Sequence, residues 1–166
     1  MGDVLTGLIV ALLAQGVDER HALTAAVYLH GAAADRLLEM GIGPIGASAL
    51  VATVDDFAQF KCGAQFGAWI GLVPRQHSSG GKAQLGRITR RGDSYLRTLL
   101  IQGAKSVVFS AHKRTDPISR WLVALRERSG WQVAAVALAN KNARILWALM
   151  TKGDAFDARH VSVKPA

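Results

Sequence analysis

The chain has 166 residues, and half of them are hydrophobic, which is enough for one compact domain with a sizeable core. Its apolar runs fall short of the roughly 18 residues that a membrane helix needs, and its start lacks the basic region of a secretory signal. The single cysteine, Cys62, excludes an internal disulfide and a multi-cysteine zinc site. We therefore expect a cytoplasmic protein with no membrane association, no metal and no cofactor.

The formal net charge of +8 is distributed unevenly along the chain. Residues 1–60 carry seven acidic side chains and two basic ones, whereas residues 61–128 carry thirteen basic and three acidic ones. A solvated basic face that maintains solubility is one interpretation of this asymmetry. Nucleic acid is the interpretation we favour, because the charges cluster around glycines and small hydroxyl residues, as in phosphate sites.

The first elements in chain order are predicted to be helices. Apolar and capping patterns predict helices over residues 4–15 and 18–39, followed by a tight turn at Gly41-Ile42-Gly43. A helix over residues 45–53 follows, with Pro44 suited to its first turn, and a shorter helix is expected over residues 62–70. Between these two helices, the carboxylates of Asp55 and Asp56 are interpreted as caps.

Residues 71–92 interrupt the helical pattern. Glycines and a proline break any long helix there: Gly71, Pro74, Gly80, Gly81, Gly86 and Gly92. We expect a glycine-rich basic central loop, with room for one short hairpin near residues 84–89. A long helix then begins at Asp93, another opens at Asp116-Pro117, and a last one spans about residues 131–151. The predicted fold class is all-α.

Two groups of side chains complete the predicted core. Along the long helix that begins at Asp93, one face is predicted from Tyr95, Leu96, Leu99, Leu100, Ala104, Val107 and Val108. Four tryptophans at helical spacing are also assigned to the core: Trp69, Trp121, Trp131 and Trp147.

The Gly41-Ile42-Gly43 turn is the first candidate binding element. Between two helices it matches a helix-hairpin-helix turn, in which glycine N–H groups and a helix N-terminus face a DNA phosphate. A Gly-x-Gly pattern is equally typical of a structural turn, so both interpretations remain open for Gly41 and Gly43.

The basic segment over residues 71–97 is the second candidate. Two serines, Ser78 and Ser79, lie beside flexible glycines and between groups that can contact phosphate. Those groups are Arg75, His77, Lys82, Arg87, Arg90, Arg91 and Arg97. A serine needs a base or a strong positive field before it can attack a phosphodiester, and cations must stabilise the developing charge. Composition alone favours passive phosphate binding over chemistry.

Four ordered blocks of sequence resemble a known family. They are GIGPIGASALVA at residues 41–52, FGAWIGLVPRQHSSGGK at 66–82, RGDSYLRTLL at 91–100 and ALANKNARILW at 137–147. Together they resemble the carboxy-terminal domain of the insertion-sequence transposases that act as bridge-RNA-guided recombinases. The resemblance extends over residues 41 to about 158.

The resemblance implies a serine that joins covalently to DNA during strand exchange. Because this serine precedes a glycine in the family pattern, it corresponds to Ser79, with Ser78 in reserve. The arginines and Lys82 would then hold DNA phosphates or a structured guide RNA, and family membership implies a homo-oligomer. Members also have an amino-terminal RuvC-like domain with four magnesium-binding acidic residues, which we do not find in this sequence.

The first residues resemble a different family. Residues 2–38 are similar to the carboxy-terminal helices of NAD(P)H-hydrate dehydratases, whose catalytic aspartate would correspond to Asp3. The sheet and nucleotide site of that family are not found in this sequence. We therefore predict a helical hairpin over residues 1–39, a transposase-type domain over 40–158 and a loose tail over 159–166.

Three functional hypotheses follow. The leading one is a nucleic-acid-binding transposase fragment that does not complete recombination alone. The second retains enzymatic activity, with Ser79 acting in DNA strand transfer when a separate RuvC-like partner is present. The third is a small interaction protein, similar to an inhibitor or antitoxin, which binds a protein partner on a transposase-derived scaffold.

Overall fold

The computed structural model describes residues 9–10, 13–14, 16, 18–20, 41–54, 56–79 and 82–152. The predicted helical hairpin over residues 1–39 is described at a few positions only, and the predicted tail over residues 159–166 lies outside the described residues. The main elements are α4 (Pro44–Thr53), α5 (Gly63–Ile70), β1 (Pro74–Ser79), β2 (Lys82–Ile88), α6 (Ser94–Ser110), α7 (Pro117–Ser129) and α8 (Trp131–Lys152). Two short 3-10 turns, η1 (Phe57–Gln59) and η2 (Ala111–Lys113), complete the order. The mainly helical class agrees with the prediction.

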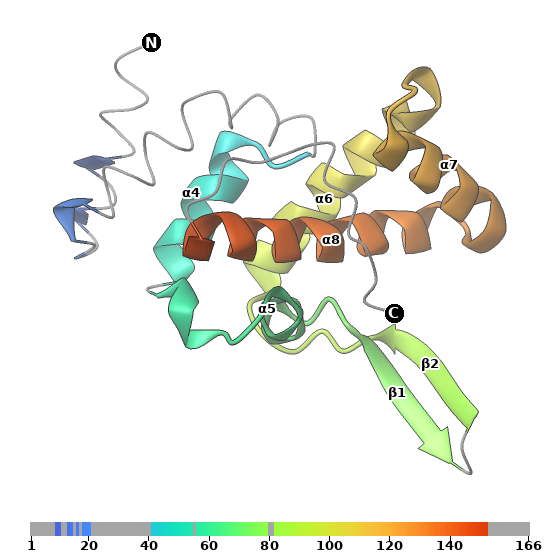
Figure 1. The fold of residues 1–166 in the computed structure, drawn as a ribbon, viewed down its shortest axis with the longest axis horizontal. Helices are drawn as coiled ribbons and strands as arrows, with labels where there is room; N and C mark the ends of the chain where they lie inside the picture. The colour runs from blue at the N-terminus through green and yellow to red at the C-terminus, as the bar shows by residue number, and fades with distance from the viewer. Residues whose placement is uncertain are drawn as a thin grey trace.

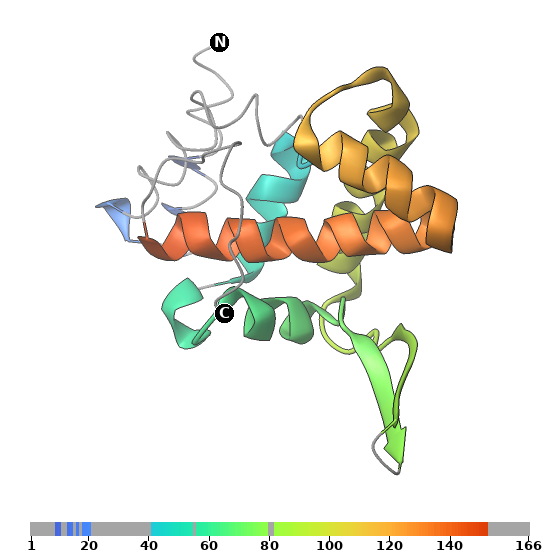
Figure 2. The same cartoon turned by 45° about the vertical axis from the view of Figure 1, so that its right-hand side comes forward.

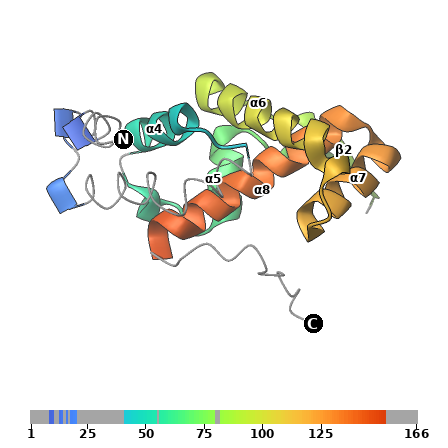
Figure 3. The ribbon, with the colours of Figure 1, turned by 90° about the horizontal axis from the view of Figure 1, so that it is seen from above.

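Helix α8 forms the centre of the described core. Helices α5, α6 and α7 all pack against it, and Figure 1 shows α8 running between α7 on one side and α5 on the other. Helix α6 passes behind α8 in Figure 1, and the view from above shows the two helices converging toward α7 (Figure 3). The buried face of α8 consists mainly of alanines and leucines at helical spacing, including Ala135, Leu138, Ala139 and Leu146. Full burial of a leucine such as Leu138 contributes about 2 kcal/mol relative to exposure.

Two glycines of α5, which have no side chain, allow this helix to approach α8 closely. A β-carbon added at Gly63 would lie 3.0 Å from the Cα of Arg144, and one added at Gly67 would lie 2.8 Å from Oδ1 of Asn140. Asn140 in turn donates from Nδ2 to the carbonyl of Leu72, at 3.4 Å. The segment that leads from α5 into β1 is therefore held directly against the central helix.

Aspartate caps define where three elements begin, as the sequence predicts. Asp93 accepts a hydrogen bond from the N–H of Leu96 at 2.7 Å, which begins α6. Asp116 does the same for α7 through Ser119, at 3.0 Å. Asp56 caps η1 and confirms the prediction of a capping role, while Asp55 lies outside the described residues. Such caps satisfy helix N–H groups that have no partner within the helix.

Three of the four tryptophans are not core residues, contrary to the prediction. Trp69, Trp121 and Trp131 are 37%, 38% and 47% exposed. Trp121 and Trp131 lie at the edge of the core, where Nζ of Lys141 is 5.3 Å from the ring centroid of Trp121. Trp147 is partly buried and donates from Nε1 to the carbonyls of Phe57 and Phe60, each at 3.2 Å.

The buried face of α6 is narrower than predicted. Tyr95 is 58% exposed and Leu99 is only partly buried. Five residues of this face are buried, as expected from their spacing: Leu96, Leu100, Ala104, Val107 and Val108.

The part of the chain that the structure describes contains no helix of sufficient length and apolar character to span a membrane.

The turn before α4 packs against the middle of α6 without space for side chains. Gly41 adopts φ +80°, and a β-carbon added there would collide with the carbonyl of Gly103 on α6. A β-carbon at Gly103 would collide with the carbonyl of Gly41. Ile42, between the two glycines of the turn, is 3% exposed. The turn is therefore part of the core packing.

This contact predicts that Gly103→Ala destabilises the protein. The free energy of unfolding should fall by roughly 3 kcal/mol, because the obstacle is backbone and cannot move aside easily. Gly46→Ala is the matched control, since a β-carbon there meets only Cγ2 of Ile42, at 3.8 Å, and alanine is the better helix former. Denaturant unfolding of both variants measures the difference. Equal stabilities would contradict the close packing of this turn against α6.

Candidate nucleic-acid interface

The predicted basic loop is an antiparallel β-hairpin that projects from the helical body (Figures 1 and 2). It is longer than the short hairpin expected near residues 84–89. The paired residues are Pro74 with Ile88, Gln76 with Leu85, His77 with Gln84, Ser78 with Ala83, and Ser79 with Lys82. The register shifts between Pro74 and Gln76, where β2 contains one extra residue. Polar residues in β1 give a weak strand signal, so pattern alone underestimated the hairpin.

The register brings two predicted site residues to one face of the hairpin. Alternate residues of a strand share a face, so Arg75 and His77 occupy same-face positions on β1. A β-carbon added at Gly86 would lie 3.9 Å from both Cβ of Arg75 and Cδ2 of His77, so Gly86 belongs to this face. Ser79 is the last residue of β1 and pairs with Lys82, the first of β2. The serine position is thus at the far end of the hairpin.

The hairpin is strongly positive. No acidic residue occurs between Asp56 and Asp93, whereas six basic ones do: Lys61, Arg75, Lys82, Arg87, Arg90 and Arg91. All four of these arginines are exposed, and so is His77. Nη2 of Arg75 donates to the carbonyl of Thr89 at 3.3 Å. A projecting element with one sign of charge attracts polyanions over several ångströms.

The base of the hairpin is built from close backbone contacts. Gly71 (φ +83°) and Gly92 (φ +89°) have no space for a β-carbon, which would collide with the carbonyls of Arg91 and Trp69, respectively. The N–H of Thr89 donates to the carbonyl of Val73 at 2.9 Å. We call this set of contacts, from residues 69–73 to residues 89–93, the hairpin root.

Arg90 also belongs to the root and adopts φ 55°, in the left-handed region that disfavours residues with a side chain. Its N–H donates to the carbonyl of Gly71, at 3.2 Å. Left-handed backbone at a residue other than glycine persists where surrounding contacts fix it.

Arg97, another predicted phosphate ligand, lies on α6 and is partly buried. Its Nη1 lies 3.0 Å from the carbonyl oxygen of Ile70, 3.5 Å from that of Arg91, 3.4 Å from that of Gly92 and 3.4 Å from that of Asp93. Sequence reasoning missed this intramolecular role, because no local pattern distinguishes an arginine that binds distant carbonyls from one that faces solvent.

The predicted Gly41–Gly43 turn is not part of the hairpin surface. It meets the middle of α6 at Gly103, whereas the hairpin root lies beside the start of that helix at Arg97. Six residues of helix, about 9 Å, separate Gly103 from Arg97. The two candidate binding elements are therefore distinct places on the molecule.

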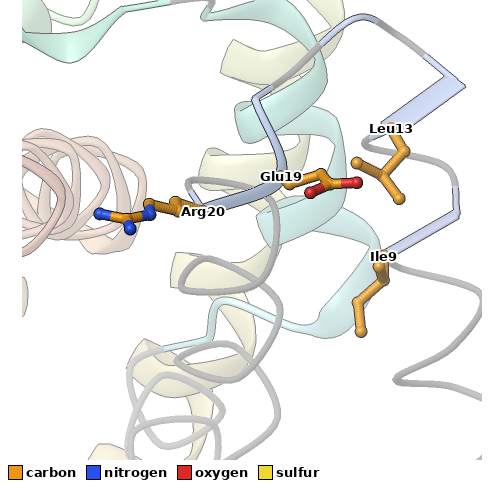
Figure 4. A pocket seen from close by; sticks show the side chains of 4 residues that line it. All are labelled: Ile9, Leu13, Glu19 and Arg20. Atoms are coloured by element: carbon orange, nitrogen blue, oxygen red, sulfur yellow. The ribbon is translucent and has the colours of Figure 1, made fainter.

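A separate hollow lies in the first part of the chain, with a volume of about 320 Å³. It is lined by Ile9, Leu13, Glu19 and Arg20, and Figure 4 shows Glu19 pointing toward Leu13 while Arg20 points the other way.

Within the described residues, no three histidine, cysteine, aspartate or glutamate side chains gather as they would around a metal ion.

Comparison with known proteins matches two families. Residues 34–118 match the transposase IS116/IS110/IS902 family, and this range includes the whole hairpin and all of α6. Residues 1–52 are similar to the NAD(P)H-hydrate dehydratase family, so the two matches overlap before and within α4.

Individual relatives agree with the first match. A probable family 20 transposase of Pseudomonas aeruginosa is 60% identical over 118 residues, which are 70% of this chain and 35% of the relative. A transposase for insertion sequence element IS1111A of Coxiella burnetii is 50% identical over 70% of this chain and 32% of its own length. A putative transposase of Sinorhizobium fredii is 49% identical over 73% of this chain and 32% of its own length. The chain spans about a third of the length of these relatives.

Proposed function

This chain belongs to the transposase IS116/IS110/IS902 family, and we propose that it binds DNA phosphates through the β1–β2 hairpin. The observation that carries the proposal is the projecting hairpin, whose arginines are exposed and which contains no acidic residue. Arg75, Lys82, Arg87, Arg90 and Arg91 supply the permanent positive charge. Arginine donates to phosphate through a planar, always charged group, which suits backbone recognition.

The shape of the hairpin favours duplex DNA over duplex RNA. A two-stranded ribbon fits the major groove of B-DNA, which is about 12 Å wide. The major groove of an A-form RNA helix is too deep and narrow for such an element. We therefore propose duplex DNA as the ligand, and structured RNA is the alternative that the experiment compares.

Salt dependence tests the binding proposal. Each neutralised phosphate of B-DNA contributes about −0.9 to the slope of log K against log salt concentration. Five hairpin cations on five phosphates would give a slope of about −4.5. Arg87→Ala should reduce the steepness by about 0.9 and weaken binding to all sequences alike. Arg120→Ala, which removes an exposed charge from α7, is the matched control and should leave the slope unchanged.

Two outcomes would contradict the proposal. One is a flat salt response, which would favour the hypothesis of a small protein-binding module. The other is an equal loss of slope in both variants, which would assign binding to the general charge of the protein and not to the hairpin. Tighter binding to structured RNA than to duplex DNA would identify RNA as the ligand instead.

We further propose that Ser79 is the nucleophile when the rest of a transposase acts with this chain. The serine Oγ would form a bond to a DNA phosphorus while the bond to the deoxyribose oxygen breaks. The hydroxyl proton would pass to a base, and the leaving oxygen would take up a proton. Support comes from the position of Ser79 at the end of a basic strand, paired with Lys82 and two positions from His77.

A covalent adduct tests this role. Wild-type protein should be mixed with labelled DNA and with the part of the Coxiella relative that this chain does not match. The expected adduct survives denaturing electrophoresis, disappears with Ser79→Ala and remains with Ser78→Ala. An adduct that persists in Ser79→Ala, or no adduct with wild-type protein, would contradict the nucleophilic role.

A further inference from the structure

We propose that Arg97 is a positioning residue that fixes the direction in which the hairpin leaves the helical body. The inference deepens the proposed function and rests on it. It assigns to one arginine of the basic segment a task different from that of its neighbours, since Arg97 would orient the DNA-binding element without touching DNA.

The contacts of Arg97 join three parts of the chain. Ile70, whose carbonyl is 3.0 Å from Nη1, is the last residue of α5. The carbonyls of Arg91 and Gly92 belong to the returning leg of the root, and that of Asp93 precedes α6. Carbonyls at the end of a helix lack partners within the helix and carry partial negative charge, so a guanidinium is well suited to bind them.

The length of the hairpin makes the root angle important. Strand β1 has six residues and therefore extends about 20 Å from the root. A rotation of about 10° at the root would displace the tip by roughly 3.5 Å, which exceeds the length of a hydrogen bond. A two-stranded hairpin is also marginally stable by itself, so its orientation depends on what holds its base.

The other arginines of the segment lack this set of contacts. Arg87, Arg90 and Arg91 are exposed, whereas Arg97 is partly buried beneath the root. Gly71 and Gly92 bring the two legs of the hairpin against each other, and the guanidinium of Arg97 lies beside that junction. A lysine at position 97 would keep the positive charge but lose the planar group that approaches several carbonyls together.

The test compares Arg97→Lys with Arg120→Lys, at an exposed arginine of α7 outside the proposed DNA-binding hairpin, since both changes keep the net charge. Amide hydrogen exchange is measured at Thr89 and Arg90, whose N–H groups close the root, and at buried amides of α8 such as Leu138. Affinity for a short DNA duplex is measured across salt concentrations. We expect Arg97→Lys to speed exchange at the root about tenfold, leave α8 unchanged, and weaken binding about tenfold at every salt concentration. Arg120→Lys should change exchange and affinity by less than about twofold.

Several outcomes would overturn the assignment. If Arg97→Lys has the same exchange rates and the same DNA affinity as the wild-type protein, only the charge of Arg97 matters. Faster exchange in α8 as well as at the root would give Arg97 a general role in stability. If the wild-type protein does not bind duplex DNA, the proposed function fails, and the exchange rates alone then decide whether Arg97 holds the root.

Discussion

The arrangement of the candidate site depends on one close approach of backbone to backbone, at the hairpin root. Gly71 and Gly92 both adopt left-handed φ, and neither has space for a β-carbon beside the facing carbonyls of Arg91 and Trp69. This contact converts the end of α5 and the start of α6 into a single junction. The hairpin extends from that junction, so the exposed arginines are presented on a projecting element and not on the surface of the bundle.

The same principle recurs elsewhere in the described core. Gly41 against Gly103 attaches the first turn to α6, and Gly63 and Gly67 allow α5 to lie against α8. Each contact joins segments that are far apart in the sequence. Close backbone packing therefore accounts for both the compactness of the helical body and the placement of the hairpin, while burial of apolar side chains, including those along α8, stabilises the body.

Local chemistry made part of this fold predictable from sequence. Asp93 and Asp116 are helix caps, and capping depends only on the next three residues. The exposed tryptophans were not predictable in the same way, because helical spacing identifies a face but not how far a neighbouring helix covers it. Trp131, which is 47% exposed, lies where that coverage ends.

The candidate site shows the same division between local and distant signals. The basic character of residues 71–97 was visible in the sequence, and the resemblance singled out Ser79. The different surroundings of Arg87, which is exposed, and Arg97, which is partly buried, were not visible, because Arg97 contacts carbonyls up to 27 residues away that only the fold brings near. A single positive segment thus contains exposed cations and one arginine directed inward.

The most direct test of the account is a nuclear magnetic resonance titration of the protein with a short DNA duplex. If the hairpin is the binding element, the largest amide shift changes should occur at residues 75–77 and 84–91, with little change along α7. Unchanged hairpin amides, together with large changes along α7 near its exposed arginines Arg120, Arg126 and Arg128, would contradict the account.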